Sequence, residues 1–318
     1  MDVYAKRFFD YSSIEELRSI FKTIPADEAV LHIGGGSNLL FTHDYEGTIL
    51  HSAIKGIEVI DSTDKNVLVK VGSGEVWDDF VAYCVQQNWG GVENLSLIPG
   101  EVGASAVQNI GAYGAEAKDV IETVEAIELR SGSCRTFSNG ECNYAYRQSI
   151  FKKELKGQYA ITHVTFRLSK TPTLQLDYGN IRAQLADKTD VTINDVRQAI
   201  ISIREAKLPD PNVLGNAGSF FMNPIVSRDT FLSIQKDYPN MPFYETNGEY
   251  KIPAGWMIEQ CGWKGKAQGR AAVHDKQALV LVNLGGATSD EIIALSDAIC
   301  HDVKEKFGVD IHPEVNFI

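Results

Sequence analysis

Three polar residues lie in sequence surroundings that suggest chemistry. Arg147 is flanked by aromatic and small polar residues, and Ser219 stands between a small-residue stretch and two phenylalanines. Glu314 lies in an apolar C-terminal segment, for which we expect a strand. If this carboxyl group is buried, its pKa rises, and the group could donate a proton or a hydrogen bond.

Each of these residues also has an ordinary structural interpretation. Arginines are usually solvated on the protein surface. Ser219 lacks the Gly-x-Ser-x-Gly elbow of a hydrolase nucleophile, so its spacing alone favours a serine that caps a turn. Glu314 could equally be solvated at the edge of a sheet. The residue types therefore offer candidates and leave the reaction open.

Two glycine-rich segments, 99–114 and 34–40, are candidates for binding an anion. Such runs usually serve a backbone that turns sharply or approaches something closely. Their backbone N–H groups can bind phosphates. A flexible surface loop is the alternative, but apolar residues such as Val102 and Ile110 should anchor the longer segment. Two such loops suit the two phosphates of a dinucleotide.

The composition argues against several classes of function. The chain of 318 residues has a formal net charge of −12 and a pI of about 5.1, which disfavours non-specific binding to nucleic acid or to an anionic membrane. We expect no signal peptide, membrane helix or metal site, since none of their patterns occurs. No P-loop lysine or Rossmann Gly-x-Gly-x-x-Gly accompanies the glycine segments. Five unclustered cysteines fit free thiols in a reducing cytoplasm, so we expect a cytoplasmic protein.

Hydrophobic periodicity and capping signals predict an α+β protein. Helices are expected after Ser13, Thr192 and Thr288, and over residues 77–85. The expected strands are 28–33, 48–52, 57–60, 67–71, 120–129 and 159–168. The proline-rich run 208–211 ends the second of these helices and predicts the main domain boundary.

The order and number of motifs resemble one family, the UDP-N-acetylenolpyruvoylglucosamine reductases of bacterial cell-wall synthesis. The resemblance covers nearly the whole chain, and although no single motif is decisive, the set is highly specific. The motifs are Gly-Gly-Gly-Ser-Asn-Leu-Leu (34–40), Pro-Gly-x-Val-Gly-Ala-Ser (99–105), Gln-Asn-Ile-Gly-Ala-Tyr-Gly (108–114), Tyr-Arg-x-Ser-x-Phe (146–151), Lys-Leu-Pro-Asp-Pro (207–211), Ala-Gly-Ser-Phe-Phe-x-Asn-Pro (217–224), Ala-Gly-Trp-Met-Ile-Glu-Gln (254–260) and Pro-Glu-Val-x-Phe-Ile (313–318).

The resemblance implies an FAD-binding fold of the vanillyl-alcohol oxidase type with a C-terminal α+β substrate domain. The implied division is 1–56 with 313–318 as the first flavin subdomain, 57–208 as the second, and 209–312 as the substrate-binding domain. The implied activity is the NADPH-dependent reduction of UDP-N-acetylglucosamine enolpyruvate to UDP-N-acetylmuramate via FAD, in peptidoglycan precursor synthesis. The implied partners are the UDP-sugar and NADPH, without nucleic acid or membrane, and we expect a monomer.

The resemblance also implies roles for individual residues. Arg147 and Glu314 would stabilise an enolate formed by hydride transfer, and Ser219 would protonate its C2 carbon as general acid. The implied substrate contacts are Tyr178, Lys207, Asn223, Tyr244, Lys264 and Gln277. The implied FAD contacts are Gly34, Gly35, Gly36, Ser37, Asn38, Leu39, Pro99, Gly100, Gly103, Ala104, Ser105, Asn109, Gly111, Ala112, Tyr113 and Ile161.

Some features refine this resemblance. The tyrosine loop at Tyr178 and the extended C-terminal domain match the larger type of the family. Met222 stands where lysine or glutamine is usual, Ala106 replaces a common proline, and Asn316 replaces a usual basic residue. The family usually has a short Asn-Thr-Phe-Gly segment before the match to Met1. We therefore expect this chain to start late and to lack an edge strand or a flavin contact.

Two rival functions compete with this interpretation. A related flavin oxidase that uses oxygen would usually attach its flavin covalently through His or Cys, and segment 99–114 contains neither. A non-catalytic sugar-nucleotide binding protein would not need Arg147, Ser219 and Glu314 together. A flavin spectrum that bleaches with NADPH would separate the reductase from both rivals.

Overall fold

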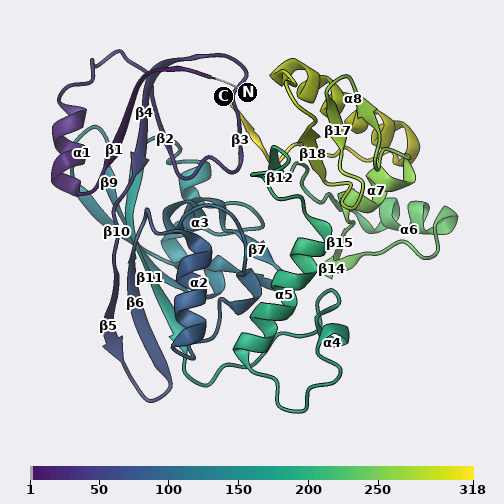
Figure 1. Cartoon of the computed structure of the whole chain (residues 1–318), viewed down its shortest axis with the longest axis horizontal. Coiled ribbons are helices and arrows are strands. Elements are labelled where there is room, and N and C mark those ends of the chain that lie inside the picture. Colours follow the sequence, from purple (N-terminus) through teal and green to yellow (C-terminus); the bar gives the residue numbers. More distant parts are fainter. Residues whose placement is uncertain (1–2, 247) are drawn as a thin grey trace. The chain divides into compact units, whose positions relative to one another are not determined.

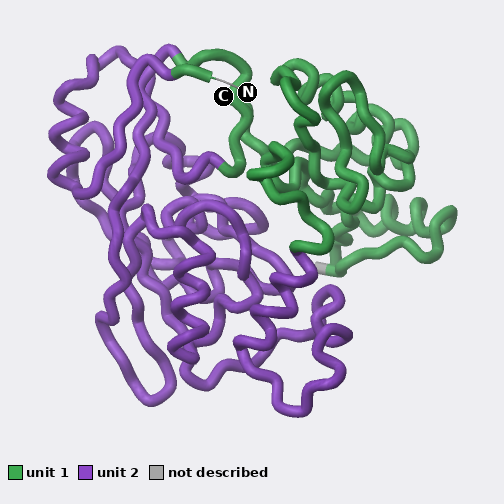
Figure 2. The backbone as a smooth tube through the Cα atoms, in the orientation of Figure 1, with its two compact units in different colours: residues 1–4, 37–45, 205–318 green, residues 5–36, 46–204 purple. Residues whose placement is uncertain are grey.

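The structure is a computed structural model that describes residues 3–246 and 248–318. The chain forms two compact units (Figure 2). Unit 1 comprises residues 1–4, 37–45 and 205–318, and unit 2 comprises residues 5–36 and 46–204. Each unit thus combines segments that are distant in the sequence.

The larger sheet of unit 2 is antiparallel, with the strand order β10-β9-β11-β6-β5 (Figure 1). Helix α2 (Trp77–Gln86) packs on this sheet, since the rings of Trp77 and Phe80 lie 5.9 and 4.8 Å from the ring of Phe166. The helix and its buried face were both predicted from the apolar spacing. The strands are β5 (Ile57–Ser62), β6 (Asn66–Gly72), β9 (Ile121–Glu128), β10 (Cys134–Ser138) and β11 (Tyr159–Ser169).

A smaller sheet in unit 2 has the strand order β1-β4-β2, with β2 parallel to β4. Its strands are β1 (Ala5–Tyr11), β2 (Val30–Ile33) and β4 (Tyr45–Ser52). Helix α1 (Ile14–Phe21) follows Ser13, whose side chain accepts a hydrogen bond from the N–H of Glu16, so the predicted N-cap is confirmed. Because β2 ends at Ile33, this sheet positions the glycine turn that starts at Gly34.

The longer glycine-rich segment is partly helical, which corrects the prediction of a loop. Helix α3 spans Val102–Gln108 and ends at Asn109, which has a left-handed φ of 46°. A Cβ atom on Gly103 would lie 2.8 Å from the Cβ atom of Ser73, so glycine is needed here for close packing within the protein. The short strands β7 (Gly111–Ala112) and β8 (Ala115–Glu116) form a hairpin after this helix.

Two further helices complete the regular α-structure near the end of unit 2. They are α4 (Ile181–Gln184) and α5 (Ile193–Lys207). Thr192 caps α5 as predicted, since its Oγ1 atom accepts a hydrogen bond of 3.2 Å from the N–H of Asp195. The division between the units falls after Arg204, within α5. Short 3-10 helices occupy Glu93–Leu95, Ala117–Asp119, Gly140–Cys142 and Ile150–Lys152.

Unit 1 is built around a sheet with the strand order β12-β18-β17-β16. Helices α7 (Ala254–Gln260) and α8 (Ser289–Phe307) share an apolar core with it. The predicted capping box of Thr288 and Glu291 begins α8, and Gly308 ends it with a φ of 68°. The strands of this sheet are β12 (Asn216–Ser219), β16 (Ala267–Gln268), β17 (Ala271–Val273) and β18 (Val280–Asn283).

The rest of unit 1 includes helix α6 (Arg228–Asp237) and two smaller sheets. One has the order β13-β15-β14, formed by Ile225–Val226, Glu249–Lys251 and Tyr244–Thr246. The other joins β3 (Leu39–Leu40) in parallel to β19 (Asn316–Phe317). This last pair brings the residues after the glycine turn next to the segment that contains Glu314.

Within residues 3–246 and 248–318, no helix has the length and apolar character needed to cross a membrane. The same ranges contain no group of three or more His, Cys, Asp or Glu residues that could hold a metal ion. All five cysteines are free thiols.

The carboxylate of Glu28 supports the smaller sheet of unit 2. It accepts hydrogen bonds from Arg7 on β1 and Thr48 on β4, and its Oε2 atom lies 3.1 Å from Nζ of Lys6. The hydrogen bond from Arg7 is the main cause that lowers the pKa of Glu28 to about 2. Because the folded-state pKa is lowered, the stabilisation is complete above the ordinary value of 4.5 and is lost as the pH falls toward 2.

We therefore expect Glu28→Gln to lower Tm at pH 7 by about 2–6 °C, and this difference from the parent should shrink as the pH falls from 4.5 toward 2. Thermal unfolding followed by circular dichroism at several pH values measures it. Glu305→Gln, on the exposed side of α8, is the matched control and should leave Tm unchanged. A difference for Glu28→Gln that stays constant with pH would contradict this role.

Candidate active site

The two predicted phosphate-binding segments lie against each other within unit 2. A Cβ atom on Gly34 would lie 3.1 Å from the Cβ atom of Ala104, and one on Gly35 would lie 3.8 Å from the Cα atom of Gly100. Gly35 and Gly36 are exposed, whereas Gly103 is buried. The two glycine segments therefore form one backbone-lined surface, which fits the diphosphate of a dinucleotide.

The N–H groups of these two segments differ in their availability. The N–H groups of Val102 and Gly103 donate to the carbonyl oxygens of Glu75 and Ser73. Those of Gly34, Gly35 and Gly36 have no hydrogen-bond partner within the described part of the chain. The first turn therefore offers donors to an anion, whereas α3 uses part of its backbone for its own packing.

The second half of the first glycine segment, Ser37 to Leu39, belongs to unit 1. There, the carbonyl oxygen of Asn38 accepts a hydrogen bond of 3.1 Å from the N–H of Asn316. The side-chain amide of Asn38 donates to the carbonyl oxygen of Glu314 at 3.4 Å. Asn38 is thus tied to the C-terminal segment of the same unit.

Asn109, a predicted FAD contact, has a structural role in unit 2. Its buried amide group donates to the carbonyl oxygen of Ala145 at 2.9 Å and to the carboxylate of Glu116 at 3.0 Å. Its Oδ1 atom accepts a hydrogen bond from the N–H of Lys118 at 3.0 Å. These contacts hold the turn that leads into Gly111, so Asn109 shapes the predicted flavin segment through its protein contacts.

Arg147 lies beside this segment. Its Nη2 atom donates to the carbonyl oxygen of Gly111 at 2.7 Å, and its Nη1 atom donates to that of Asn109 at 3.4 Å. Its backbone has a φ of 56°, which is rare for a residue other than glycine, and such strain concentrates at functional sites. The structure therefore brings the predicted catalytic arginine to the predicted flavin segment, within unit 2.

Ser219 and Glu314 lie in neighbouring segments of unit 1. Ser219 is exposed at the end of β12, and the N–H of Glu314 donates to the carbonyl oxygen of the next residue, Phe220, at 2.7 Å. Glu314 is half-buried and lies between the bridge of Pro313 with Phe221 and β19, so the expected terminal strand is confirmed only at Asn316–Phe317. The buried rings of Phe220 and Phe221 anchor this part of the chain.

The other predicted residues are distributed over both units. In unit 2, Tyr178 makes an edge-on contact with the ring of Tyr113 at 6.4 Å, and Ile161 is buried in β11. In unit 1, Lys207 is exposed at the end of α5, and the ring of Tyr244 lies 5.6 Å from Nζ of Lys251. Lys264 pairs with Glu259 at 2.9 Å.

In unit 1, the side-chain amides of Asn223 and Gln277, both predicted to contact substrate, accept hydrogen bonds from backbone N–H groups. The Oδ1 atom of Asn223 accepts a hydrogen bond of 2.9 Å from the N–H of Ala254, and Gln277 accepts one of 3.3 Å from that of Leu279. Each amide is thereby oriented by an element of the unit 1 core.

The structure adds groups that sequence reasoning missed. His51 on β4 contacts Glu101, the acidic residue of the second glycine segment, at 2.8 Å. Arg204 lies beside Tyr113, and its burial lowers the pKa of its guanidinium group, although the neighbouring Tyr113 and Asp78 oppose this. No pattern in the sequence signals either contact, because the partners are far apart along the chain, and neither His51 nor Arg204 belongs to a motif.

Comparison with known proteins agrees with this geometry. Residues 5–138 match the family described as FAD binding domain, and residues 210–318 match the one described as UDP-N-acetylenolpyruvoylglucosamine reductase, C-terminal domain. The chain is 61% identical to the UDP-N-acetylenolpyruvoylglucosamine reductase of Bacteroides fragilis, over 100% of this chain and 96% of that protein. It is 46% identical to the reductase of Neisseria gonorrhoeae, over 99% and 92% of the two chains.

The comparison of folds gives the same result. The crystal structure of UDP-N-acetylenolpyruvylglucosamine reductase from Thermus caldophilus superimposes with a TM-score of 0.68, covering 98% of this chain and 91% of that one at 19% identity. The predicted fold class, an FAD-binding fold of the vanillyl-alcohol oxidase type with a C-terminal α+β domain, is confirmed. The chain belongs to the UDP-N-acetylenolpyruvoylglucosamine reductase family.

Proposed function

We propose a separate role in the reaction of this family for each group of residues described above. The protein is an FAD-containing oxidoreductase that reduces UDP-N-acetylglucosamine enolpyruvate to UDP-N-acetylmuramate with NADPH, in peptidoglycan precursor synthesis. When bound, FAD would supply the hydride chemistry that links NADPH to C3 of the enolpyruvyl group. The protein must then manage the charge and the proton.

The charge is the first task. Hydride addition at C3 leaves an electron pair that spreads from C2 onto the carboxylate of the substrate. Arg147 would offset this negative charge with its guanidinium group, and Glu314 would contribute to the electrostatic stabilisation of the enolate. The support for Arg147 is its contact with the carbonyl oxygen of Gly111 in the predicted flavin segment.

The proton is the second task. The Oγ–H group of Ser219 would transfer its proton to C2, which forms the new C–H bond and completes the lactyl group. A hydroxyl group is a weak acid, but the enolate is a strong enough base to accept its proton. The resulting serine alkoxide would recover a proton from solvent. The observation that carries this assignment is the hydrogen bond from the N–H of Glu314 to Phe220, since it joins the segments of the two residues.

Binding is the third task. The exposed turn of Gly34, Gly35 and Gly36 would hold the FAD diphosphate through its N–H groups, together with the adjoining 37–39 and 99–105. Segment 109–113 and Ile161 would contact the flavin. The UDP-sugar would contact Tyr178, Lys207, Asn223, Tyr244, Lys264 and Gln277.

The larger type of the family is also part of the proposal. Tyr178 would belong to its tyrosine loop, and the edge-on contact with Tyr113 supports this assignment. We further propose a cytoplasmic monomer and the domain division 1–56 with 313–318, 57–208 and 209–312.

The role of the first glycine turn can be tested at Gly35. A Cβ atom there meets no atom closer than 3.8 Å, so Gly35→Leu should fold but should cover the N–H groups of the turn. We expect this variant to purify with less than about a tenth of the parent's FAD, since losing charge-assisted hydrogen bonds to the diphosphate costs about 1.5–3 kcal/mol. Gly140→Leu is the matched control, because a Cβ atom there meets nothing within 4 Å.

Flavin content per protein is read from absorbance, and circular dichroism checks the fold. Full FAD occupancy in Gly35→Leu would remove the turn from the FAD site. Acid precipitation should release the yellow cofactor from the parent, whereas a covalently attached flavin would favour the oxidase rival.

The role of Ser219 can be tested by separating the two half-reactions. In Ser219→Ala, NADPH should still reduce the flavin at nearly the parent rate, because that step needs no proton from residue 219. Oxidation of the reduced flavin by the enolpyruvyl substrate should slow by about 10²–10⁴-fold, and Ser219→Cys should recover part of the loss. Stopped-flow absorbance of the flavin measures both steps. If Ser219→Ala is oxidised by substrate as fast as the parent, Ser219 is a structural residue.

A further inference from the structure

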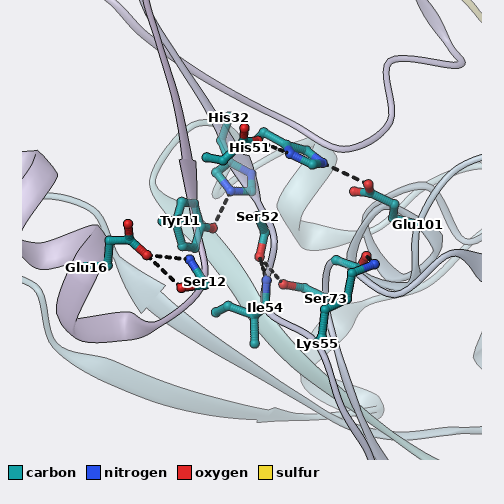
Figure 3. Close-up of polar contacts among 12 residues, drawn as sticks. Tyr11, Ser12, Glu16, His32, His51, Ser52, Ile54, Lys55, Ser73 and Glu101 are labelled. Carbon is teal, nitrogen blue, oxygen red and sulfur yellow. Dashed lines mark hydrogen bonds and ion pairs between the residues drawn. The ribbon is translucent and has the colours of Figure 1, made fainter.

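A histidine bridges two carboxylates beside the glycine turn of unit 2. Figure 3 shows this residue, His51, and its contact with Glu101. The Nδ1 atom of His51 lies 2.6 Å from Oδ1 of Asp10, and its Nε2 atom lies 2.8 Å from Oε1 of Glu101. Both ring nitrogens can donate to ionised carboxylates only when the imidazole is protonated. The geometry is therefore that of an imidazolium between two anions.

Glu101 connects this bridge to the proposed FAD site. It is the acidic residue of segment 99–105, and its Oε2 atom would lie 3.2 Å from a Cβ atom on Gly34. Its side chain is 13% exposed, so the carboxylate has little water to screen it. His51 itself lies on β4 opposite Ile33, the residue that precedes the glycine turn. The bridge thus touches both segments that form the backbone-lined surface.

The groups that face His51 from β1 and β2 are an aromatic ring, a carboxylate and a second histidine. Phe8 on β1 stacks on its ring at 6.5 Å, and Asp10 on the same strand is largely exposed. His32 on β2 contacts the hydroxyl of Tyr11 at 2.5 Å, and burial lowers the pKa of His32 to about 4, so it stays neutral. Burial also opposes protonation of His51, but the hydrogen bonds to Asp10 and Glu101 outweigh it and raise its pKa.

We propose that His51 is a positioning residue for the flavin cofactor, which it serves by fixing the Glu101 carboxylate beside the glycine turn and offsetting its negative charge. This inference rests on the proposed FAD site at the glycine turn. With His51 protonated, the three side chains carry a net charge of −1, and with His51 neutral they carry −2. The neutral ring has a single N–H group and can donate to only one of the two carboxylates, so the bridge between them is lost.

FAD affinity should therefore fall as the pH rises through the pKa of His51. That pKa is raised above 6.5 by the hydrogen bonds to Asp10 and Glu101, so the loss belongs to pH values above 6.5. One unit charge within about 8 Å of a diphosphate in a partly screened site changes affinity by roughly three- to tenfold. The effect should shrink in high salt, because salt screens partly exposed charges.

Titration of the flavin-free protein with FAD, followed by flavin fluorescence between pH 6 and pH 9, tests this. In the parent, Kd should rise about three- to tenfold over this range. His51→Gln should bind weakly at all pH values, with a flat profile. Glu101→Gln should bind more tightly than the parent at pH 9, and the double variant should recover most of the affinity lost in His51→Gln. His301→Gln, at an exposed position on α8, is the matched control and should follow the parent.

The outcomes separate this inference from the proposed function. A parent that binds FAD with the same Kd from pH 6 to pH 9 overturns the role of His51 and leaves the FAD site intact. A Glu101→Gln variant that keeps the parent's pH profile also overturns the role of His51. This measurement stays informative even where His51→Gln folds poorly. A double variant as weak as His51→Gln would make His51 a purely structural residue. A parent that binds no FAD at any pH overturns both the inference and the proposed site.

Discussion

The close approach of α3 to the end of β6 is the contact on which unit 2 depends. Gly103 lies against Ser73 with no space for a Cβ atom, and its N–H donates to the carbonyl oxygen of Ser73. This contact sets where the segment 99–105 meets Gly34, and where the chain turns at Asn109 toward Gly111 and Arg147. A helix of larger residues would push each of these features outward.

Much of the fold could be predicted from the sequence, because its signals are local. Helices α2, α5 and α8 carry apolar stripes, and α5 and α8 also begin at capping residues; their predicted starts agree with the structure. Helix α3 was missed because its small residues show no apolar period, and glycine is a poor helix former in isolation. Tertiary packing decides its conformation. The strand expected around Glu314 is limited to Asn316–Phe317, and the backbone of Glu314 is held instead by its N–H bond to Phe220 and by the Asn38 amide at its carbonyl oxygen.

The candidate site was partly predictable. Motif order predicts roles for Arg147, Ser219 and Glu314, which stay predictions, but spacing could not tell which backbone N–H groups are available. The N–H groups of Val102 and Gly103 are used within the protein, whereas those of the first turn are not bonded within the described chain. The contact of His51 with Glu101 was also beyond sequence reasoning, because it joins strands and loops that meet only in the folded chain.

The pairing of β3 with β19 has a consequence for the order in which the protein forms during synthesis. Leu39 and Phe317 belong to strands that lie side by side, yet nearly the whole chain is translated between them. The larger sheet of unit 2 is complete long before β19 leaves the ribosome, so it can fold early. Residues 37–45 must wait for the C-terminal segment of unit 1. In a nascent chain, the larger sheet of unit 2 would therefore be folded before the segment that carries Glu314 pairs with β3.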